Sequence, residues 1–285
     1  MRTPTDAATS GDVLLSAAII TFNEEKQIAD CIASVHDFCD EVLVLDSHST
    51  DRTREIAVSF PKVRFLAHDF DGHIQQKNRA LDHTRGRWIL SLDADERVTP
   101  ELAASIQAFI RENPEAQGVR LPRLTYHMGR YIRYGGWYNA RVRLIRRGQG
   151  RWGGENPHDQ IFLKDAPRWK ANIGPRLKGD LIHYSFKDLS HQVDTINKFS
   201  SIVSFTRAGR SKPYSFWKLV FKPLSKFLEM YIFKAGFLDG TPGLVIAVSS
   251  AYSTFLKWAK LYELKHTDIE RPSNLRADYK VQDES

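Results

Sequence analysis

Apolar and polar residues follow one another in blocks along the first 111 residues. Short, largely β-branched apolar runs predict buried strands at 14–21, 41–46, 63–66 and 88–92. Segments whose apolar residues recur every three or four positions predict helices at 23–35, 51–59, 74–84 and 100–111. Strands that alternate with helices in this way form βαβ units, so the pattern predicts an α/β fold with a mainly parallel, Rossmann-like central sheet flanked by helices.

The second half of the chain shows two further patterns. From 126 to 162 the sequence is rich in Arg, Gly, Trp and Tyr without a clear period, which indicates loops and short strands. From about 189 the pattern is helical and basic. We therefore expect a disordered N-terminal tail (1–12), one α/β domain (13–188), a basic helical C-terminal extension (189–266) and a polar tail (267–285).

Charge is concentrated in the helical extension. The net charge is +7 and the isoelectric point is near 9.3, which favours a polyanionic partner such as nucleic acid, an anionic lipid surface or a phosphorylated substrate. Aromatic residues stand among Lys218, Lys222 and Lys226, a composition typical of a helix at an anionic membrane surface. The alternative is an ordinary amphipathic helix packed on the α/β domain.

Other features of the composition indicate a cytoplasmic setting. The chain has two cysteines, Cys31 and Cys39, whose spacing matches neither a disulfide framework nor a zinc site. Residues 1–12 lack the basic-then-apolar order of a signal peptide, and the uncharged stretch 241–256 is too short and too polar for a membrane span. We expect a cytoplasmic protein at the inner face of the cytoplasmic membrane.

Polar clusters follow three of the predicted strands, at 21–24, 46–51 and 93–95. In open parallel sheets, ligands bind outside the carboxyl ends of the strands. Asp93 and Asp95, one residue apart at such an end, suit a hard divalent cation that bridges to a diphosphate. The alternative is that Asp95 or Glu96 caps the helix that begins near Pro100.

Two further clusters suit a nucleotide. Asp46 could accept from a ribose hydroxyl or a base N–H, with hydroxyls such as that of Ser49 beside it; the alternative is a helix cap by Ser49 or Thr50. The helical cluster 75–78 could place Lys77 at the diphosphate and Gln76 or Asn78 near the nucleoside. Its alternative is a solvated helix face.

One loop offers a general base. A group transfer to a hydroxyl needs a base that removes the hydroxyl proton. In the segment 154–159 we favour Asp159, with Glu155 in reserve, and His158 could contact a metal or a phosphate. An exposed surface role is the alternative for Asp159. The arginines between 130 and 147 could hold phosphates or simply solvate a face.

These residues resemble the family 2 glycosyltransferases of the GT-A fold. The resemblance is carried by four motifs in order: ITFNEE (20–25), DSHSTD (46–51), QKN (76–78) and LDADE (92–96). Later segments are similar to the bacterial branch that includes lipopolysaccharide core β-1,4-glucosyltransferases: GGWY (135–138), RLIRR (143–147), NPHD (156–159), HYS (183–185) and GFLDG (236–240). Together they cover roughly residues 15–261.

The resemblance implies a role for each matching residue. Thr21, Asn23 and Glu24 would hold the uracil and ribose, with Asp46 on the base or ribose. Asp93 and Asp95 would handle the sugar and the Mg²⁺ or Mn²⁺ ion on the diphosphate. His48 replaces a small residue, and His-Asp stands at 158–159 where many relatives carry His-Glu, so the base would be the shorter carboxylate.

The resemblance and the residues together predict an inverting transferase. It would move a sugar, with glucose as the favoured candidate, from a UDP-sugar to a lipid-linked or phosphorylated saccharide. It would have no nucleic-acid partner. A nucleotidyltransferase is the first rival, but a Gly-rich basic loop is expected after its first strand. A non-catalytic nucleic-acid-binding protein is the second, and the acids at the strand ends disfavour a polyanion there.

Overall fold

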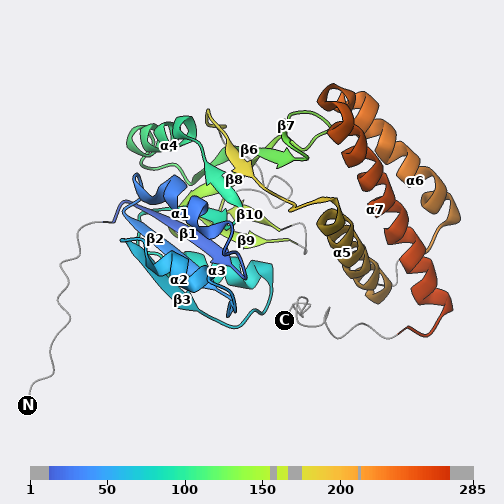
Figure 1. Ribbon diagram of the computed structural model, residues 1–285, viewed down its shortest axis with the longest axis horizontal. Helices are drawn as coiled ribbons and strands as arrows, with labels where there is room; N and C mark the ends of the chain where they lie inside the picture. The colour runs from blue at the N-terminus through green and yellow to red at the C-terminus, as the bar shows by residue number, and fades with distance from the viewer. Residues whose placement is uncertain (1–12, 155–158, 166–174, 211–212, 270–285) are drawn as a thin grey trace, which may run out of the picture.

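The computed structural model describes residues 13–154, 159–165, 175–210 and 213–269 (Figure 1). Its strands are β1 (Leu15–Thr21), β2 (Glu41–Asp46), β3 (Val63–Ala67), β4 (Trp88–Asp93), β5 (Glu96–Val98), β6 (Gly118–His127), β7 (Arg130–Ile132), β8 (Asn139–Arg146), β9 (Gly150–Gly153), β10 (Gln160–Leu163) and β11 (Leu181–His183). The helices of the α/β part are α1 (Ile28–His36), α2 (Thr53–Val58), α3 (His73–His83) and α4 (Pro100–Glu112).

The first half of the sheet is parallel, as the sequence predicts. Its strands lie in the order β3-β2-β1-β4, and β1 pairs in parallel with both β2 and β4. The register aligns Thr21 with Asp46 and Ile20 with Asp93. The carboxyl ends of these three strands therefore meet at one edge of the sheet, which brings the polar clusters that follow them together.

The second half of the sheet is mixed. β8 pairs antiparallel with both β4 and β6, β11 runs parallel to β6, and β5 closes the sheet antiparallel to β11. The segment predicted as loops and short strands thus includes an eight-residue strand, β8, at the centre of the sheet. β9 and β10 form a separate hairpin.

Both faces of the sheet are covered, because successive side chains of a strand point to opposite faces. Ala17 and Ile19 of β1 pack into a core that α1, α2 and α4 close on one side. Ala18 packs with Ala80 and Leu81 of α3 and with the β9–β10 hairpin on the other side. This three-layer arrangement is the predicted α/β fold with flanking helices, and it is confirmed.

The helix starts differ from the sequence prediction. Asn23 adopts a left-handed conformation (φ 53°) and caps no helix, and α1 begins at Ile28. The N-cap of α4 is Thr99, whose hydroxyl accepts from the Leu102 N–H, so neither Asp95 nor Glu96 caps that helix. Neither Ser49 nor Thr50 caps α2, which begins at Thr53. The polar residues at the strand ends are thereby left for other contacts.

The C-terminal extension is helical. It comprises α5 (Leu189–Gly209), α6 (Phe216–Leu228), the π-helical η2 (Glu229–Phe233), the 3-10 helix η3 (Gly236–Asp239) and α7 (Gly240–His266). α7 packs along both α5 and α6 (Figure 1). Among the described helices, none is by itself long and apolar enough to cross a membrane, whereas the bent pair 216–233 and 236–266 meets the length and composition criteria together, with a 69° bend.

The hairpin of α6 and α7 is fixed to the α/β domain at its bend. The carboxylate of Asp239 accepts hydrogen bonds from the backbone N–H groups of Arg133 and Tyr134, at 3.2 and 2.8 Å. At the same bend Gly243 lies so close to Gly236 that a Cβ on Gly243 would stand 1.9 Å from the carbonyl oxygen of Gly236. The hairpin and the domain therefore form one tightly joined unit at this point.

Candidate active site

The loops after β1 and β2 are cross-linked by hydrogen bonds. The side-chain oxygen of Asn23 accepts from the Thr50 N–H (2.8 Å), and the Asn23 N–H donates to the Ser49 hydroxyl (2.8 Å). Asp46 in turn accepts from the N–H and the hydroxyl of Ser49. The Glu24 N–H donates to the Thr53 hydroxyl. Four of the predicted nucleotide-binding residues, Asn23, Glu24, Asp46 and Ser49, thus belong to one connected structure.

Three side chains at the carboxyl edge of the parallel strands, those of Thr21, Asp95 and Glu24, are electrostatically unusual. Two of them have an oxygen that lacks a hydrogen-bond partner in the described part of the chain, and the third has a raised pKa. Among the described residues, the buried Thr21 hydroxyl and Asp95 Oδ1 have no hydrogen-bond partner. Burial, and next the charge of Asp95, raise the pKa of Glu24 to about 7. Such uncompensated polar groups are expected where a ligand or a cation binds.

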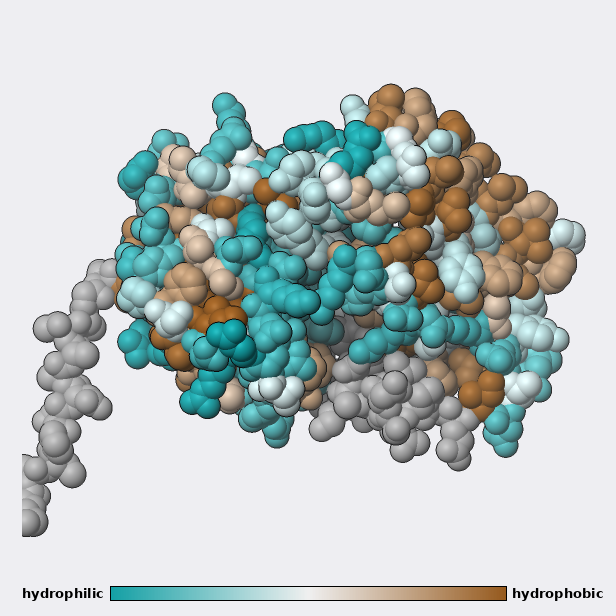
Figure 2. All heavy atoms as spheres, in the orientation of Figure 1, coloured by the Kyte–Doolittle hydropathy of each residue, from teal (hydrophilic) through white to brown (hydrophobic). Residues whose placement is uncertain are grey.

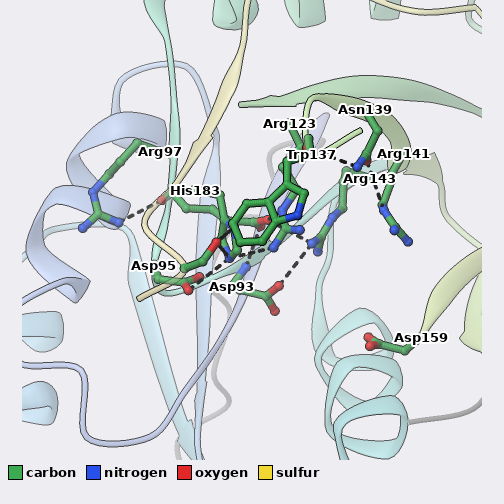
Figure 3. Close-up of polar contacts among 12 residues, drawn as sticks. Asp93, Asp95, Arg97, Arg123, Trp137, Asn139, Arg141, Arg143, Asp159 and His183 are labelled. Atoms are coloured by element: carbon green, nitrogen blue, oxygen red, sulfur yellow. Dashed lines mark hydrogen bonds and ion pairs between the residues drawn. The ribbon is translucent and has the colours of Figure 1, made fainter. Parts of the chain in front are cut away.

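Asp95 lies beside His183 of β11. Its Oδ2 is 3.3 Å from Nε2 of His183, and Nε2 is 2.6 Å from a guanidinium nitrogen of Arg123. Burial alone would raise the pKa of Asp95, but the charge and hydrogen bond of His183 together lower it. Figure 3 shows Asp95 beside His183, whereas the carboxylate of Asp93 points toward Arg143.

Asp93 faces cations. One carboxylate oxygen is 3.1 Å from Nζ of Lys77, and the other is 3.1 Å from Nη2 of Arg143. Burial opposes ionisation, yet the charges of Lys77 and Arg143 hold the pKa of Asp93 well below its usual range. Arg143 also donates to Glu96 at 2.9 Å, and the fully buried Glu96 accepts from Arg123 at 2.8 Å. This network holds Asp93 ionised and fixed.

Asp159 is the second partner of Lys77. Its Oδ2 lies 2.8 Å from Nζ, and its side chain is 14% exposed, so the alternative of a plain surface residue is wrong. Burial would raise the pKa of Asp159, and the charge of Lys77 lowers it below the ordinary value. Lys77 itself is buried, which also excludes the solvated helix face. One ammonium thus joins the two carboxylates.

A pocket with a volume of about 140 Å³ lies between these groups. It is lined by Lys77, Asp93, Arg123, Arg141, Val142, Arg143, Trp152, Asp159 and Gln160. The Trp152 ring forms one wall, with Nζ of Lys77 at 4.2 Å and the Arg143 guanidinium at 5.0 Å from its centroid. Arg141 and Arg143 point toward the carboxylates of Asp93 and Asp159 (Figure 3). A pocket lined by four cations suits an anionic ligand such as a diphosphate.

Gln76 and Asn78 do not line this pocket. The amide of Gln76 donates to the Ser47 hydroxyl (3.0 Å) and accepts from Arg79, so it supports the loop after β2. The amide of Asn78 donates to the carbonyl oxygen and accepts from the N–H of Trp152, both at 2.9 Å, so it joins α3 to β9. Their direct contact with a nucleotide stays a prediction, and it would require these amides to change partners.

Several site residues were not given a role by sequence reasoning. His183 and Arg123 come from strands far along the chain, and Trp152 comes from the β9–β10 hairpin. Arg141 and Arg143 were among the candidate phosphate ligands, and their i, i+2 spacing places them on one face of a strand. Recognising β8 in the sequence would have singled out this pair. Glu155 and His158 lie outside the described residues.

The donor set fits a divalent cation held by few protein ligands. Within the part of the chain that the structure describes, no group of three or more His, Cys, Asp or Glu side chains could hold a metal ion. Asp95, which has an unpartnered oxygen, and His183 beside it could supply two ligands. Mg²⁺ and similar ions are commonly bound by one or two carboxylates, with waters and substrate phosphates as the remaining ligands.

The comparisons with known proteins identify the family of the chain. The model of the glycosyl transferase family 2 matches residues 16–161, from β1 to the start of β10. The lipopolysaccharide core biosynthesis glycosyltransferase LpsC of Rhizobium meliloti is 31% identical over 265 residues, covering 91% of this chain and 95% of that protein. The chain therefore belongs to glycosyl transferase family 2, and it is a glycosyltransferase.

Other similar proteins extend over the same length. An uncharacterized glycosyltransferase of Rickettsia typhi is 29% identical and covers 88% of this chain and 87% of its own. Among solved structures, S. aureus TarS 1–349 in complex with UDP covers 91% of this chain and 93% of its own, at 16% identity and a TM-score of 0.46. The R. meliloti and R. typhi relatives thus match the C-terminal extension as well as the α/β domain.

Proposed function

We propose that this glycosyltransferase moves glucose from UDP-glucose to a saccharide acceptor of the lipopolysaccharide core or another cell-envelope glycan, with inversion at the anomeric carbon. The observation that carries the proposal is the cationic pocket between Asp93 and Asp159, at the carboxyl edge of the parallel strands where Asp46 and Asp95 also stand. The name of the R. meliloti relative supports the class of acceptor.

The nucleoside would bind at the cross-linked loops. Asp46 has both carboxylate oxygens on Ser49, and each oxygen keeps acceptor capacity for a base N–H or a ribose hydroxyl. The buried Thr21 hydroxyl is a further unpaired group at the same strand ends. Asn23 would act chiefly through structure: its backbone is left-handed, and its side chain joins the loop after β1 to the loop after β2.

Asp95 and His183 would hold the metal ion, Mg²⁺ or Mn²⁺, which supplies positive charge to the leaving diphosphate when it is bound. Both carboxylate oxygens of Asp93 are already paired with Lys77 and Arg143, so we assign it to the donor sugar rather than to the metal. The cations of the pocket would stabilise the diphosphate as the sugar leaves. Glu24, whose pKa is about 7, is close enough to Asp95 for the two charges to interact.

Asp159 would be the general base. It would remove the proton of the acceptor hydroxyl as that oxygen attacks the anomeric carbon and the bond to UDP breaks, a single displacement that inverts the centre. In the structure its carboxylate is paired with Lys77, which weakens it as a base. Because Lys77 lies in the same pocket as the diphosphate, donor binding would draw the ammonium toward phosphate and leave Asp159 more basic.

The experiment that tests the function is product analysis with a panel of nucleotide sugars. The enzyme is incubated with Mn²⁺, lipopolysaccharide core oligosaccharide and each nucleotide sugar, and released nucleotide and the anomeric configuration of the product are measured. We expect UDP release that depends on acceptor, fastest with UDP-glucose, and an inverted linkage. Release of sugar 1-phosphate instead of UDP, with the nucleoside monophosphate transferred, would identify a nucleotidyltransferase, and a retained configuration would refute the role of Asp159 in a single displacement.

A further inference from the structure

Helix α6 is apolar on a side that nothing in the structure covers. None of its residues is buried. Phe216, Trp217, Phe221 and Leu224 are 58, 67, 54 and 55% exposed. Trp217 and Phe221 stack on each other with ring centroids 5.7 Å apart, so they form a continuous aromatic surface. A helix that only packed on the catalytic domain would bury this side, so that alternative does not describe α6.

The exposed apolar residues of α6 form one face. This face consists of Phe216, Trp217, Val220, Phe221, Leu224 and Leu228. At 100° per residue these positions fall within a sector of about 140°. Lys218, Lys222 and Lys226 recur every four residues and fall at about 200° to 280° from Phe216, on the side of the helix opposite this face. An apolar side opposed to a side that carries lysines is the distribution expected of a helix that lies in a lipid–water interface.

The apolar face continues beyond α6. Phe233 at the end of η2 is 81% exposed, and Phe237 and Leu238 of η3 are about half exposed. α7 adds a row of exposed apolar side chains at helical spacing, Leu244, Val248, Tyr252 and Phe255. Figure 2 shows hydrophobic residues gathered over the α6–α7 hairpin, whereas the visible α/β domain is mostly hydrophilic. Soluble monomers rarely expose apolar surfaces this extended.

We propose that the apolar face of the α6–α7 hairpin binds an anionic lipid bilayer, with its aromatic side chains in the interfacial region of one leaflet and the lysine row on the polar side of α6, attracted by the negative surface potential of the headgroups. The charges favour lipid over a second copy of the chain. Lys218 and Lys222 have no acidic partner among the described residues, and anionic headgroups would neutralise them, whereas a second copy would bring further lysines. Aromatic side chains are also enriched at membrane–water interfaces.

The attachment of the hairpin gives this binding a consequence for the reaction. Asp239 joins the bend of the hairpin to the backbone of Arg133 and Tyr134, so the apolar face and the α/β domain are held in a fixed relation. An enzyme bound by this face meets acceptors that are anchored in the same leaflet. The inference goes beyond the proposed function, since the identity of the sugar and of the acceptor does not enter into it.

The test is co-sedimentation of the full chain with vesicles of phosphatidylcholine alone and of phosphatidylcholine with 30% phosphatidylglycerol, without nucleotide or acceptor. Three variants are compared with wild type. Trp217→Ser/Phe221→Ser removes the aromatic surface, and Lys218→Gln/Lys222→Gln removes the two lysines that have no acidic partner among the described residues. Val58→Ser is the control, because Val58 is an apolar residue of α2 that is 53% exposed. All four side chains of the two test variants lie at the surface, so the fold should persist in circular dichroism.

We expect wild type and Val58→Ser to bind the anionic vesicles equally. The aromatic variant should bind at least about tenfold more weakly at any salt concentration. The lysine variant should lose about fivefold per lysine at low salt and little at high salt. Binding of the aromatic variant like wild type, or no binding of wild type, would overturn the proposal. So would a lipid-free dimer that the aromatic variant converts to a monomer, because the face would then join two copies.

Discussion

Replacing Lys77 with methionine removes the ammonium that joins Asp93 and Asp159 and keeps most of the apolar stem of the side chain. Lys77 is buried, and its Nζ lies 3.1 Å from Asp93 and 2.8 Å from Asp159. Removing one partner of a buried ion pair typically costs about 3–5 kcal/mol. Asp93 keeps Arg143 at 3.1 Å, so we expect the low end, a loss of about 3 kcal/mol in the free energy of unfolding at pH 7.

The pH dependence of this loss follows from the pKa of Asp159. Lys77 lowers that pKa below its ordinary value of 3.8, so the pair stabilises the fold above pH 3.8 and this stabilisation disappears as the pH falls through the folded-state pKa. The difference between Lys77→Met and wild type should therefore be full at pH 7 and shrink below about pH 4.

Urea unfolding followed by circular dichroism measures the effect, with Lys164→Met, at an exposed lysine, as the matched control. The double variant Lys77→Met/Asp159→Asn should lose less free energy of unfolding than the sum of the two single variants. In the double variant a neutral amide replaces the carboxylate that Lys77→Met alone leaves without its partner. If Lys77→Met is within about 0.5 kcal/mol of the control at pH 7, the ion pairs do not stabilise the fold and the reasoning is refuted.

Three further outcomes concern the reaction. Asp159→Asn should lower transfer about a hundred- to ten-thousand-fold at unchanged UDP affinity by calorimetry; an equal fall in UDP affinity would move this residue to the donor site. Asp95→Asn should raise the half-saturating Mn²⁺ concentration at least about tenfold, and an unchanged Mn²⁺ titration would remove Asp95 from the metal. Glu24→Gln should raise the thermal midpoint at pH 8 but not at pH 4. Burial raises the pKa of Glu24 from 4.5 to about 7 in the folded state, so ionisation of this carboxyl destabilises the fold as the pH rises from 4.5 through 7. The variant removes this destabilisation. Equal midpoints at pH 8 would contradict it.

The parallel strands β1, β2 and β4 could be predicted because they are buried on both faces. Such strands read as continuous apolar runs, as 41–46 does, where all six residues are buried. β8 has Arg141 and Arg143 two residues apart, because one of its faces lines a charged pocket. No local pattern separates such a strand from an arginine-rich loop, so it was not predicted.

The site was predictable where its residues follow strands that are adjacent in the sheet. Asp46, Asp93 and Asp95 stand at the ends of β2 and β4, which both flank β1. Contacts made across the mixed half of the sheet were not predictable. His183 reaches Asp95 because β11 pairs with β5 and β6, a pairing that its three residues do not reveal. The start of α1 was also misplaced, because the contacts of Asn23 with Thr50 and Ser49 outweigh local capping.

The hydrogen bonds between the loops after β1 and β2 also bear on the kinetics of nucleotide binding. Asn23, Ser49 and Asp46 are connected before any ligand arrives, so binding does not have to order either loop. Association should then be a single exponential phase whose rate rises linearly with nucleotide concentration. Amide exchange in both loops should be slow in the free enzyme and change little on nucleotide binding, since the two loops open together rather than separately.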